Sequence, residues 1–218
     1  MQFINLHTHR LTKALNVLEI VNQYPQEFDS IIAFYSIGIH PWYINESRVE
    51  ADLKIIEEKL QTENCLALGE CGLDKRIEIS IEIQKQVFEK QLKLAIKYKK
   101  AVILHCVSAY QEIIEIKSRL QVEVPMIIHG FSKNKQVAKL LLDNGFYLSF
   151  GKYLLRNPAL GPIFASVPND RFFLETDTIE ETLEEVYKLA AKYKNIEVSE
   201  LQKIVENNFQ NVFYNIKK

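Results

Sequence analysis

The chain is short of cysteine, glycine and proline, with 3, 7 and 6 of them among its 218 residues. The cysteines Cys65, Cys71 and Cys106 are odd in number, form no CxxC pair and lie in apolar stretches, so a disulfide framework is not expected. Few glycines and prolines, with 47% hydrophobic and 25% charged residues, are typical of a packed globule without disordered segments. We therefore expect one domain over residues 1–218, in a cytoplasmic protein.

The chain has neither an excess of one charge nor a long run of apolar residues. With 27 basic and 28 acidic residues, the chain has no generalised electrostatic attraction for nucleic acid, so phosphate binding must come from a local cluster or from bound metal. No stretch approaches the roughly eighteen apolar residues of a membrane span. The start, MQFINLHTHR, lacks the pattern of a secretion signal, so we expect neither secretion nor a membrane partner.

Three common catalytic motifs are also missing from the sequence. It contains no GxGxxG or GxxxxGK[ST] segment, which argues against a nucleotide cofactor, and no GxSxG segment, which argues against a serine hydrolase. Any catalytic activity is therefore expected to depend on other side chains.

Short apolar segments alternate with longer segments that carry apolar residues at helical spacing, as in residues 79–99 and 133–144. Such alternation predicts βαβ units. Polar residues at the strand ends are spread along the whole chain, which favours a (β/α)₈ TIM barrel over an open doubly wound sheet. The eight predicted strands are Gln2–His7, Asn16–Val21, Ile31–Gly38, Cys65–Glu70, Ala101–His105, Pro125–His129, Phe146–Phe150 and Phe172–Glu175.

The early part of this barrel is expected to be reduced. About nine residues separate the second predicted strand from the third, which is too few for a crossover helix. We therefore predict a compact barrel with shortened early helices. Four helix starts are predicted from capping-box spacing: Ser47 with Glu50, Ser108 with Gln111, Thr178 with Glu181, and Ser199 with Gln202.

The histidines carry the strongest functional signal. There are only five, and each stands at the C-terminal end of a predicted strand: His7, His9, His40, His105 and His129. In a barrel these ends surround one cavity, so residues distant in sequence converge there.

Two carboxylates join the histidines: Glu70 closes the fourth predicted strand and Asp177 follows the eighth. Alternation along an extended chain puts His7 and His9 on the same side, as two ligands of one ion require. A mixed nitrogen and oxygen set suits Zn, Mn or Mg, and it exceeds the three protein ligands of a typical catalytic zinc. We expect two, or at most three, divalent ions.

Each of these residues has a simpler interpretation when taken alone. A lone histidine is more often a hydrogen-bonded structural group, and Glu70 or Asp177 could be a helix cap or a solvated acid. Their shared placement favours the metal site. His40, in GIHPW, is the weakest candidate, and Trp42 beside it is either a stacking platform or, as we favour, a cover on the rim.

The motifs together resemble the TatD family of metal-dependent deoxyribonucleases, within the amidohydrolase superfamily. The resemblance covers nearly the whole chain and consists, in order, of NLHTH, GIHPW, GECGLD, VILHC, IIHGFS, LSFGK, FLETD and NFQNVF. It implies phosphodiester hydrolysis by a metal-activated hydroxide, with Asp177 and Glu70 as catalytic carboxylates and Glu70 bridging two ions. The metal ligands that it implies are His7, His9, Glu70, His105, His129 and Asp177.

The chain departs from the family pattern at positions that concern the substrate. Asn5 replaces the usual aspartate, Val107 replaces an arginine, and the loop with an Arg-Asn-Glu-Pro run after the last strand is absent. These changes predict a shallow site for DNA or a small phosphoester. Cations on the predicted mouth loops that could hold phosphate are Arg10, Lys75, Arg76, Lys133, Lys152 and Arg156.

Two other functions remain open from the sequence. The same metal centre polarises a carbonyl as readily as a phosphoryl group, so an amidohydrolase acting on a C–N or carboxylic-ester bond is the closest alternative. A binding barrel that keeps metal only for stability is the second. Removal of the metal would distinguish them, since only the binding barrel would lose stability without showing hydrolytic activity.

Overall fold

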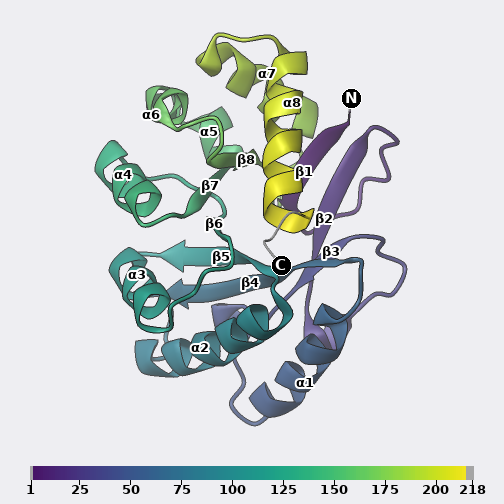
Figure 1. Ribbon diagram of the computed structural model, residues 1–218, viewed down its shortest axis with the longest axis vertical. Helices are drawn as coiled ribbons and strands as arrows, with labels where there is room; N and C mark the ends of the chain where they lie inside the picture. Colours follow the sequence, from purple (N-terminus) through teal and green to yellow (C-terminus); the bar gives the residue numbers. More distant parts are fainter. Residues whose placement is uncertain (1, 215–218) are drawn as a thin grey trace. The chain divides into compact units, whose positions relative to one another are not determined.

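The computed structural model describes residues 2–214, which form eight strands and the helices between them (Figure 1). The strands are ordered β1 to β8, as they follow along the chain. By contacts the chain divides into two compact units, one built from residues up to Val21 and from Ile128 onward, the other from Asn22–Ile127. We call them the terminal unit and the central unit.

The central unit is built around two long parallel strands, β4 (Cys65–Asp74) and β5 (Ala101–Val107). Every residue of β4 is buried, as expected for a strand covered on both faces. The shorter β3 (Tyr35–Ile37) pairs with β4 on its other side, and β6 (Met126–Ile128) lies at the end of the unit.

Three α-helices cover these strands: α1 (Val49–Leu60), α2 (Ile81–Tyr98) and α3 (Tyr110–Arg119). Apolar residues such as Phe88 and Leu92 recur at helical spacing on α2 and are buried against β4, and α1 packs beside α2 (Figure 1). Two single-turn 3₁₀ helices, η1 (Pro25–Glu27) and η2 (Pro41–Tyr43), flank β3.

The terminal unit joins both ends of the chain. Its strand β1 (Phe3–Thr8) pairs with β2 (Val17–Gln23) and contacts β8 (Phe172–Leu174), which pairs with β7 (Tyr147–Phe150). Its helices are α4 (Lys135–Asp143), α5 (Lys152–Arg156), η3 (Pro158–Leu160), α6 (Gly161–Ser166), α7 (Leu183–Lys194), α8 (Val198–Phe209) and the π-helix η4 (Gln210–Tyr214).

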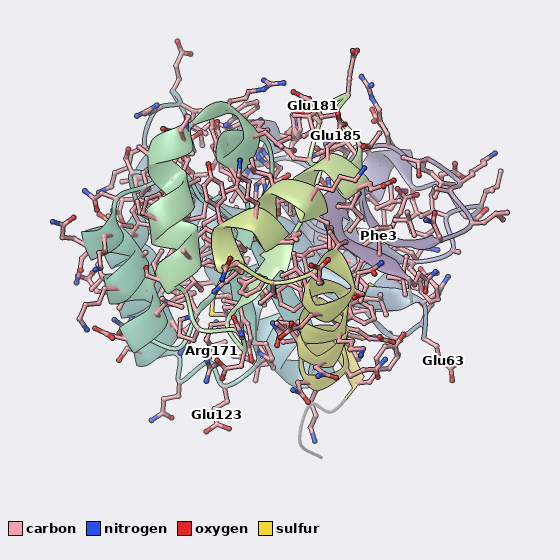
Figure 2. All side chains as sticks on the ribbon, turned by 90° about the horizontal axis from the view of Figure 1, so that it is seen from above. Phe3, Glu63, Glu123, Arg171, Glu181 and Glu185 are labelled. Carbon is pink, nitrogen blue, oxygen red and sulfur yellow. The ribbon has the colours of Figure 1, made fainter. Side chains whose placement is uncertain are left out.

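Helices α7 and α8, near the C-terminal end of the described chain, both pack against β1. In Figure 1 α8, in yellow, lies along β1, in purple, and the two are in contact. The Tyr187 hydroxyl of α7 donates to the Ile4 carbonyl at 3.0 Å and accepts from the Ile4 amide at 3.2 Å. Phe3, labelled in Figure 2, meets the Tyr187 ring edge-on, with ring centroids 5.0 Å apart.

The structure confirms a strand within each of the eight predicted segments and helices within residues 79–99 and 133–144. It also confirms the reduced early part, because no α-helix occurs before α1 in the described chain and only η1 lies between β2 and β3. No helix among residues 2–214 is long and apolar enough to cross a membrane.

None of the four predicted capping residues is an N-cap, although α1, α3 and α8 begin within two residues of Ser47, Ser108 and Ser199. The N-caps of α1, α3, α7 and α8 are Arg48, Ala109, Thr182 and Glu197. The Ser47 hydroxyl is used elsewhere, since it donates to Asn45 at 2.7 Å. Ser108 has a φ of 57°, which is incompatible with the extended backbone of an N-cap. A complete capping box lies instead at Thr182 and Glu185, four residues beyond Thr178.

Candidate metal centre

The central unit gathers three side chains from the ends of neighbouring strands. Glu70 lies on β4, His105 on β5 and His40 just after β3, and their donor atoms all lie within 4.8 Å of one another. Glu70 Oε1 is 2.9 Å from His105 Nδ1 and 3.1 Å from His40 Nε2. Two imidazoles and one carboxylate therefore face a common point.

The backbone around Glu70 is tightly held. Its amide donates to the Asn22 side chain at 2.6 Å. A Cβ placed on Gly38 would lie 3.0 Å from the Glu70 carbonyl oxygen and 3.0 Å from the Gly69 Cα. A side chain at Gly38, directly after β3, would force its neighbours to shift, so glycine permits this close approach to the Glu70 backbone.

Asp74 and Trp42 lie on the other side of His105. Asp74 Oδ2 accepts from Trp42 Nε1 at 2.8 Å and is 3.3 Å from His105 Nε2. Burial raises the pKa of Asp74. Hydrogen bonds from Trp42 and the Arg76 amide, and the contact with His105, lower it by a larger amount, so the pKa lies below the ordinary value of an aspartate. Trp42 is 54% exposed, and its ring makes T-shaped contacts with the rings of His40 and His105.

The terminal unit gathers a second cluster, formed by His7, His129 and Asp177, with donor atoms again within 4.8 Å of one another. The rings of His7 and His129 have centroids 4.4 Å apart. His9 adjoins the cluster, since its Nε2 is 3.6 Å from Asp177 Oδ1 and its ring is 5.0 Å from that of His7. The alternation in His7-Thr8-His9 does bring the two rings together.

Backbone pairing places Asp177 beside His7 of β1 and beside His9, which follows this strand. The Asp177 amide donates to the His7 carbonyl at 2.9 Å, and the His9 amide donates to the Asp177 carbonyl at 3.1 Å. Lys152 Nζ donates to Asp177 Oδ2 at 2.9 Å. Burial raises the pKa of Asp177, but electrostatic interactions with His129 and His7 and the hydrogen bond from Lys152 outweigh this effect, so the pKa falls below its usual value.

Glu175 supports His129 from the same unit. This carboxylate is 1% exposed, and its Oε1 accepts from the Gly130 amide at 2.7 Å and lies 3.4 Å from His129 Nδ1. A Cβ on Gly151 would lie 2.5 Å from the Glu175 carbonyl oxygen, so the chain after β7 needs glycine there. Glu175 and Asp74 were not among the site residues predicted from the sequence, although Glu175 lies in the motif FLETD and Asp74 in GECGLD.

All six residues predicted as ligands thus fall into one cluster or the other. His7, His9, His129 and Asp177 lie in the terminal unit, and Glu70 and His105 lie in the central unit. His40, the weakest candidate from the sequence, is the third member of the central cluster. Cys71 and Cys106, which neighbour two of these residues along the chain, are buried and unbridged.

Of the predicted phosphate-binding cations, Lys152 is beside the cluster, while others are engaged elsewhere. Arg156 forms an ion pair with Glu181 at 3.0 Å, and Lys75 pairs with Glu112. Lys152 is therefore a predicted cation that directly contacts a candidate catalytic group, the Asp177 carboxylate.

The donor atoms fit a divalent metal ion. Neutral imidazole nitrogens and carboxylate oxygens are the ligands that zinc and manganese commonly take in proteins. Each cluster supplies two imidazoles and one carboxylate at short range, and His9 adds a further nitrogen to the terminal cluster.

Comparison with known proteins gives a consistent result. The family model described as TatD related DNase matches residues 1–214. A metal-dependent hydrolase of Bacillus subtilis is 34% identical over 171 residues, covering 77% of this chain and 63% of that protein. A protein of Edwardsiella piscicida named 3'-5' ssDNA/RNA exonuclease TatD is 26% identical, over 93% of this chain and 84% of that protein. The chain spans 54% to 66% of the length of the first four curated relatives.

The solved structures agree on the fold. A TatD homologue from Escherichia coli K12 superposes with a TM-score of 0.83 at 21% identity, over 97% of both chains. This likeness confirms the (β/α)₈ barrel predicted from the strand pattern. Since the family model covers nearly every residue, the chain belongs to the family of TatD-related DNases.

Proposed function

We propose that the chain is a divalent-metal-dependent hydrolase of phosphodiester bonds. The observation that carries the proposal is the grouping of five histidines and two carboxylates into two clusters of donor atoms. A structural histidine needs only a hydrogen-bond partner, whereas three donors around one point are what a metal ion requires. Membership of the TatD-related DNase family supports the phosphodiester bond as the target.

The proposed ligands are divided between the clusters. His7, His9, His129 and Asp177 would hold an ion in the terminal unit, and Glu70 with His105 and His40 would hold one in the central unit. Glu70 remains our candidate for the bridging carboxylate, as the family resemblance implies. We propose two ions, or at most three, of Zn, Mn or Mg. A bound ion would supply Lewis-acid chemistry, since it lowers the pKa of water and stabilises charge on a phosphoryl oxygen.

The chain's own contribution to proton transfer is Asp177. Lys152 holds Oδ2, which leaves Oδ1 toward His9 and His7 at 3.6 and 3.9 Å. The lowered pKa keeps the carboxylate ionised at neutral pH, so Oδ1 can accept a proton from water. We propose Asp177 as the general base, with Lys152 restricting its rotation.

The substrate is proposed as DNA or a small phosphoester. One relative is named an ssDNA/RNA exonuclease, which favours nucleic acid. The net charge of −1 and the replacement of an expected arginine by Val107 favour a smaller compound. We keep the prediction of a cytoplasmic protein, since three cysteines in apolar stretches, without a CxxC pair, do not indicate a disulfide framework.

The test is hydrolysis by metal-stripped protein that has been resupplied with Mg, Mn or Zn. Single-stranded DNA and a chromogenic phosphodiester serve as substrates, with His129→Ala as the ligand variant and Lys139→Ala, on the exposed face of α4, as the control. Activity should return with metal in the wild type and the control and stay absent in His129→Ala. Hydrolysis of carboxylic esters or amides alone would support the amidohydrolase alternative, and bound metal without any hydrolysis would support a binding barrel.

A further inference from the structure

His105 is enclosed by a carboxylate at each ring nitrogen, and both carboxylates belong to the central unit. Its Nδ1 lies 2.9 Å from Glu70 Oε1 and its Nε2 lies 3.3 Å from Asp74 Oδ2. A neutral imidazole carries one N–H and one nitrogen with a lone pair. In the neutral form that binds a metal, only one of the two nitrogens can therefore donate to its carboxylate, and the other has the lone pair of a ligand.

The carboxylate of Asp74 is held by groups that fix its position. Oδ2 accepts from Trp42 Nε1 and Oδ1 accepts from the Arg76 amide, both at 2.8 Å. The Asp74 amide donates to Gln84 Oε1 at 2.8 Å, and Gln84 Nε2 donates to the Asp74 carbonyl at 2.9 Å. Asp74 is 3% exposed and Gln84 is 1% exposed, so water does not compete for these bonds.

The surroundings of Nδ1 are different. Glu70 Oε1, which faces this nitrogen, also faces His40 Nε2 at 3.1 Å. Among the described residues, the donor group found here contains His40, Glu70 and His105 but not Asp74. The Nδ1 atom of His105 thus faces the other potential ligands of the cluster, whereas its Nε2 atom faces the fixed carboxylate of Asp74.

We propose that Asp74, held by Trp42, is a positioning residue that accepts the Nε2–H of His105 and so leaves Nδ1 as the nitrogen that binds the metal. The inference rests on the proposed metal site. A histidine ligand commonly donates its second N–H to a carboxylate, and loss of that partner typically lowers metal affinity about 10- to 100-fold. Trp42 then has a defined role, because its indole orients the carboxylate that orients the ligand.

Trp42 also provides a signal for metal binding. It is the single tryptophan of the chain. Its ring centroid lies 5.7 Å from that of His105 and 5.1 Å from that of His40. Its fluorescence should therefore respond when a metal ion binds beside these two rings.

The experiment is a zinc titration of metal-stripped wild type, Asp74→Asn and Asp52→Asn, followed by Trp42 fluorescence and by equilibrium dialysis with metal analysis. Asparagine keeps the size of Asp74 but removes the charged acceptor. Asp52 is the matched control, because it is a carboxylate of the same unit, 4% exposed, that pairs with Arg48. We expect Asp74→Asn to bind zinc about 10- to 100-fold more weakly than the wild type and Asp52→Asn to match it. Imidazole ¹⁵N spectra of the zinc-loaded wild type should show His105 metal-bound at Nδ1 and protonated at Nε2.

Several results would overturn the proposal. Unchanged zinc affinity in Asp74→Asn, or spectra that show zinc on Nε2, would remove the positioning role while leaving the metal site intact. Absence of zinc binding by the wild type would remove both. If circular dichroism shows that Asp74→Asn does not fold, Trp42→Phe decides, since it replaces the indole of a half-exposed side chain by a smaller ring without the N–H that Asp74 accepts. Dialysis should then show a several-fold weaker affinity, and wild-type affinity would contradict the proposal.

Discussion

Asn5 illustrates how a single residue can act on the site through its neighbour. It stands where the family usually has aspartate. Its Oδ1 accepts from the Thr176 amide at 3.0 Å, and its Nδ2 donates to the Thr176 hydroxyl at 2.8 Å. Thr176 directly precedes Asp177, so Asn5 holds the segment that presents the proposed general base. The side-chain amide of Asn5 has an N–H donor, which a carboxylate lacks, and the Thr176 hydroxyl oxygen accepts its hydrogen bond.

We predict that Asp177→Asn lowers kcat about 10²- to 10⁴-fold, because an amide cannot take up the proton. Both side chains have the same size, so the circular dichroism spectrum should be unchanged. Steady-state hydrolysis of the chromogenic phosphodiester measures the loss. The matched control is Asp170→Asn, an exposed acid of the same unit that pairs with Arg171, which should keep wild-type rates. Retained activity in Asp177→Asn would exclude it as the base.

A second prediction at this scale concerns the thiols. Burial raises the pKa of Cys65 to about 12 and raises that of Cys71 still further, so neither forms the reactive thiolate near pH 8. In a Cys106→Ser background, Ellman's reagent should leave the native protein unmodified over a time in which guanidinium-unfolded protein reacts at both cysteines. Modification of the native protein at the unfolded rate would show that this core opens readily.

At the scale of elements, hydrogen-bonded pairing with the neighbouring strand sets where a strand begins and ends. Runs of apolar residues predict some of these ends wrongly. Apolar residues begin at Ile31 in the third predicted strand, yet Ile31 is 79% exposed and β3 starts only at Tyr35, where pairing with Cys65 begins. In contrast, β4 continues past Glu70 because its residues up to Asp74 pair with β5. The extension is what carries Asp74 to His105.

We predict that Thr182→Ala lowers the free energy of unfolding by about 1 kcal/mol, since it removes the N-cap of α7. The Thr182 hydroxyl accepts from the Glu185 amide, and the Glu185 carboxylate accepts from the Thr182 amide at 2.7 Å. Urea denaturation measures the difference. Thr178→Ala is the control, because the exposed Thr178 matches the same spacing without capping a helix, and it should change stability little. Equal effects of the two substitutions would show that the cap contributes nothing.

For the whole molecule, we propose that residues 1–218 form one domain and predict that both units unfold in a single transition. The terminal unit is made from both ends of the chain, and residues 22–127 connect its two parts. If the central unit unfolded first, this connection would become a long flexible loop, whose closure costs entropy and so destabilises the terminal unit.

Two tryptophan probes test this prediction during urea unfolding. Trp42 reports on the central unit, and a Tyr153→Trp substitution in a Trp42→Phe background reports on the terminal unit through a ring that is 41% exposed. Each protein should show the same midpoint by fluorescence and by far-ultraviolet circular dichroism. Separate fluorescence and circular dichroism midpoints within one protein would contradict a single domain.

The sequence by itself determined the alternation of strands and helices and the position of every histidine at a strand end. Apolar periodicity and strand ends are local properties, so one chain suffices to read them. The order of the motifs also determined the family. Only the tertiary structure decided that His40 joins Glu70, that Lys152 holds Asp177 and that Asp74 with Trp42 encloses His105. Strand register and rotamers set these contacts, and neither is encoded in local spacing.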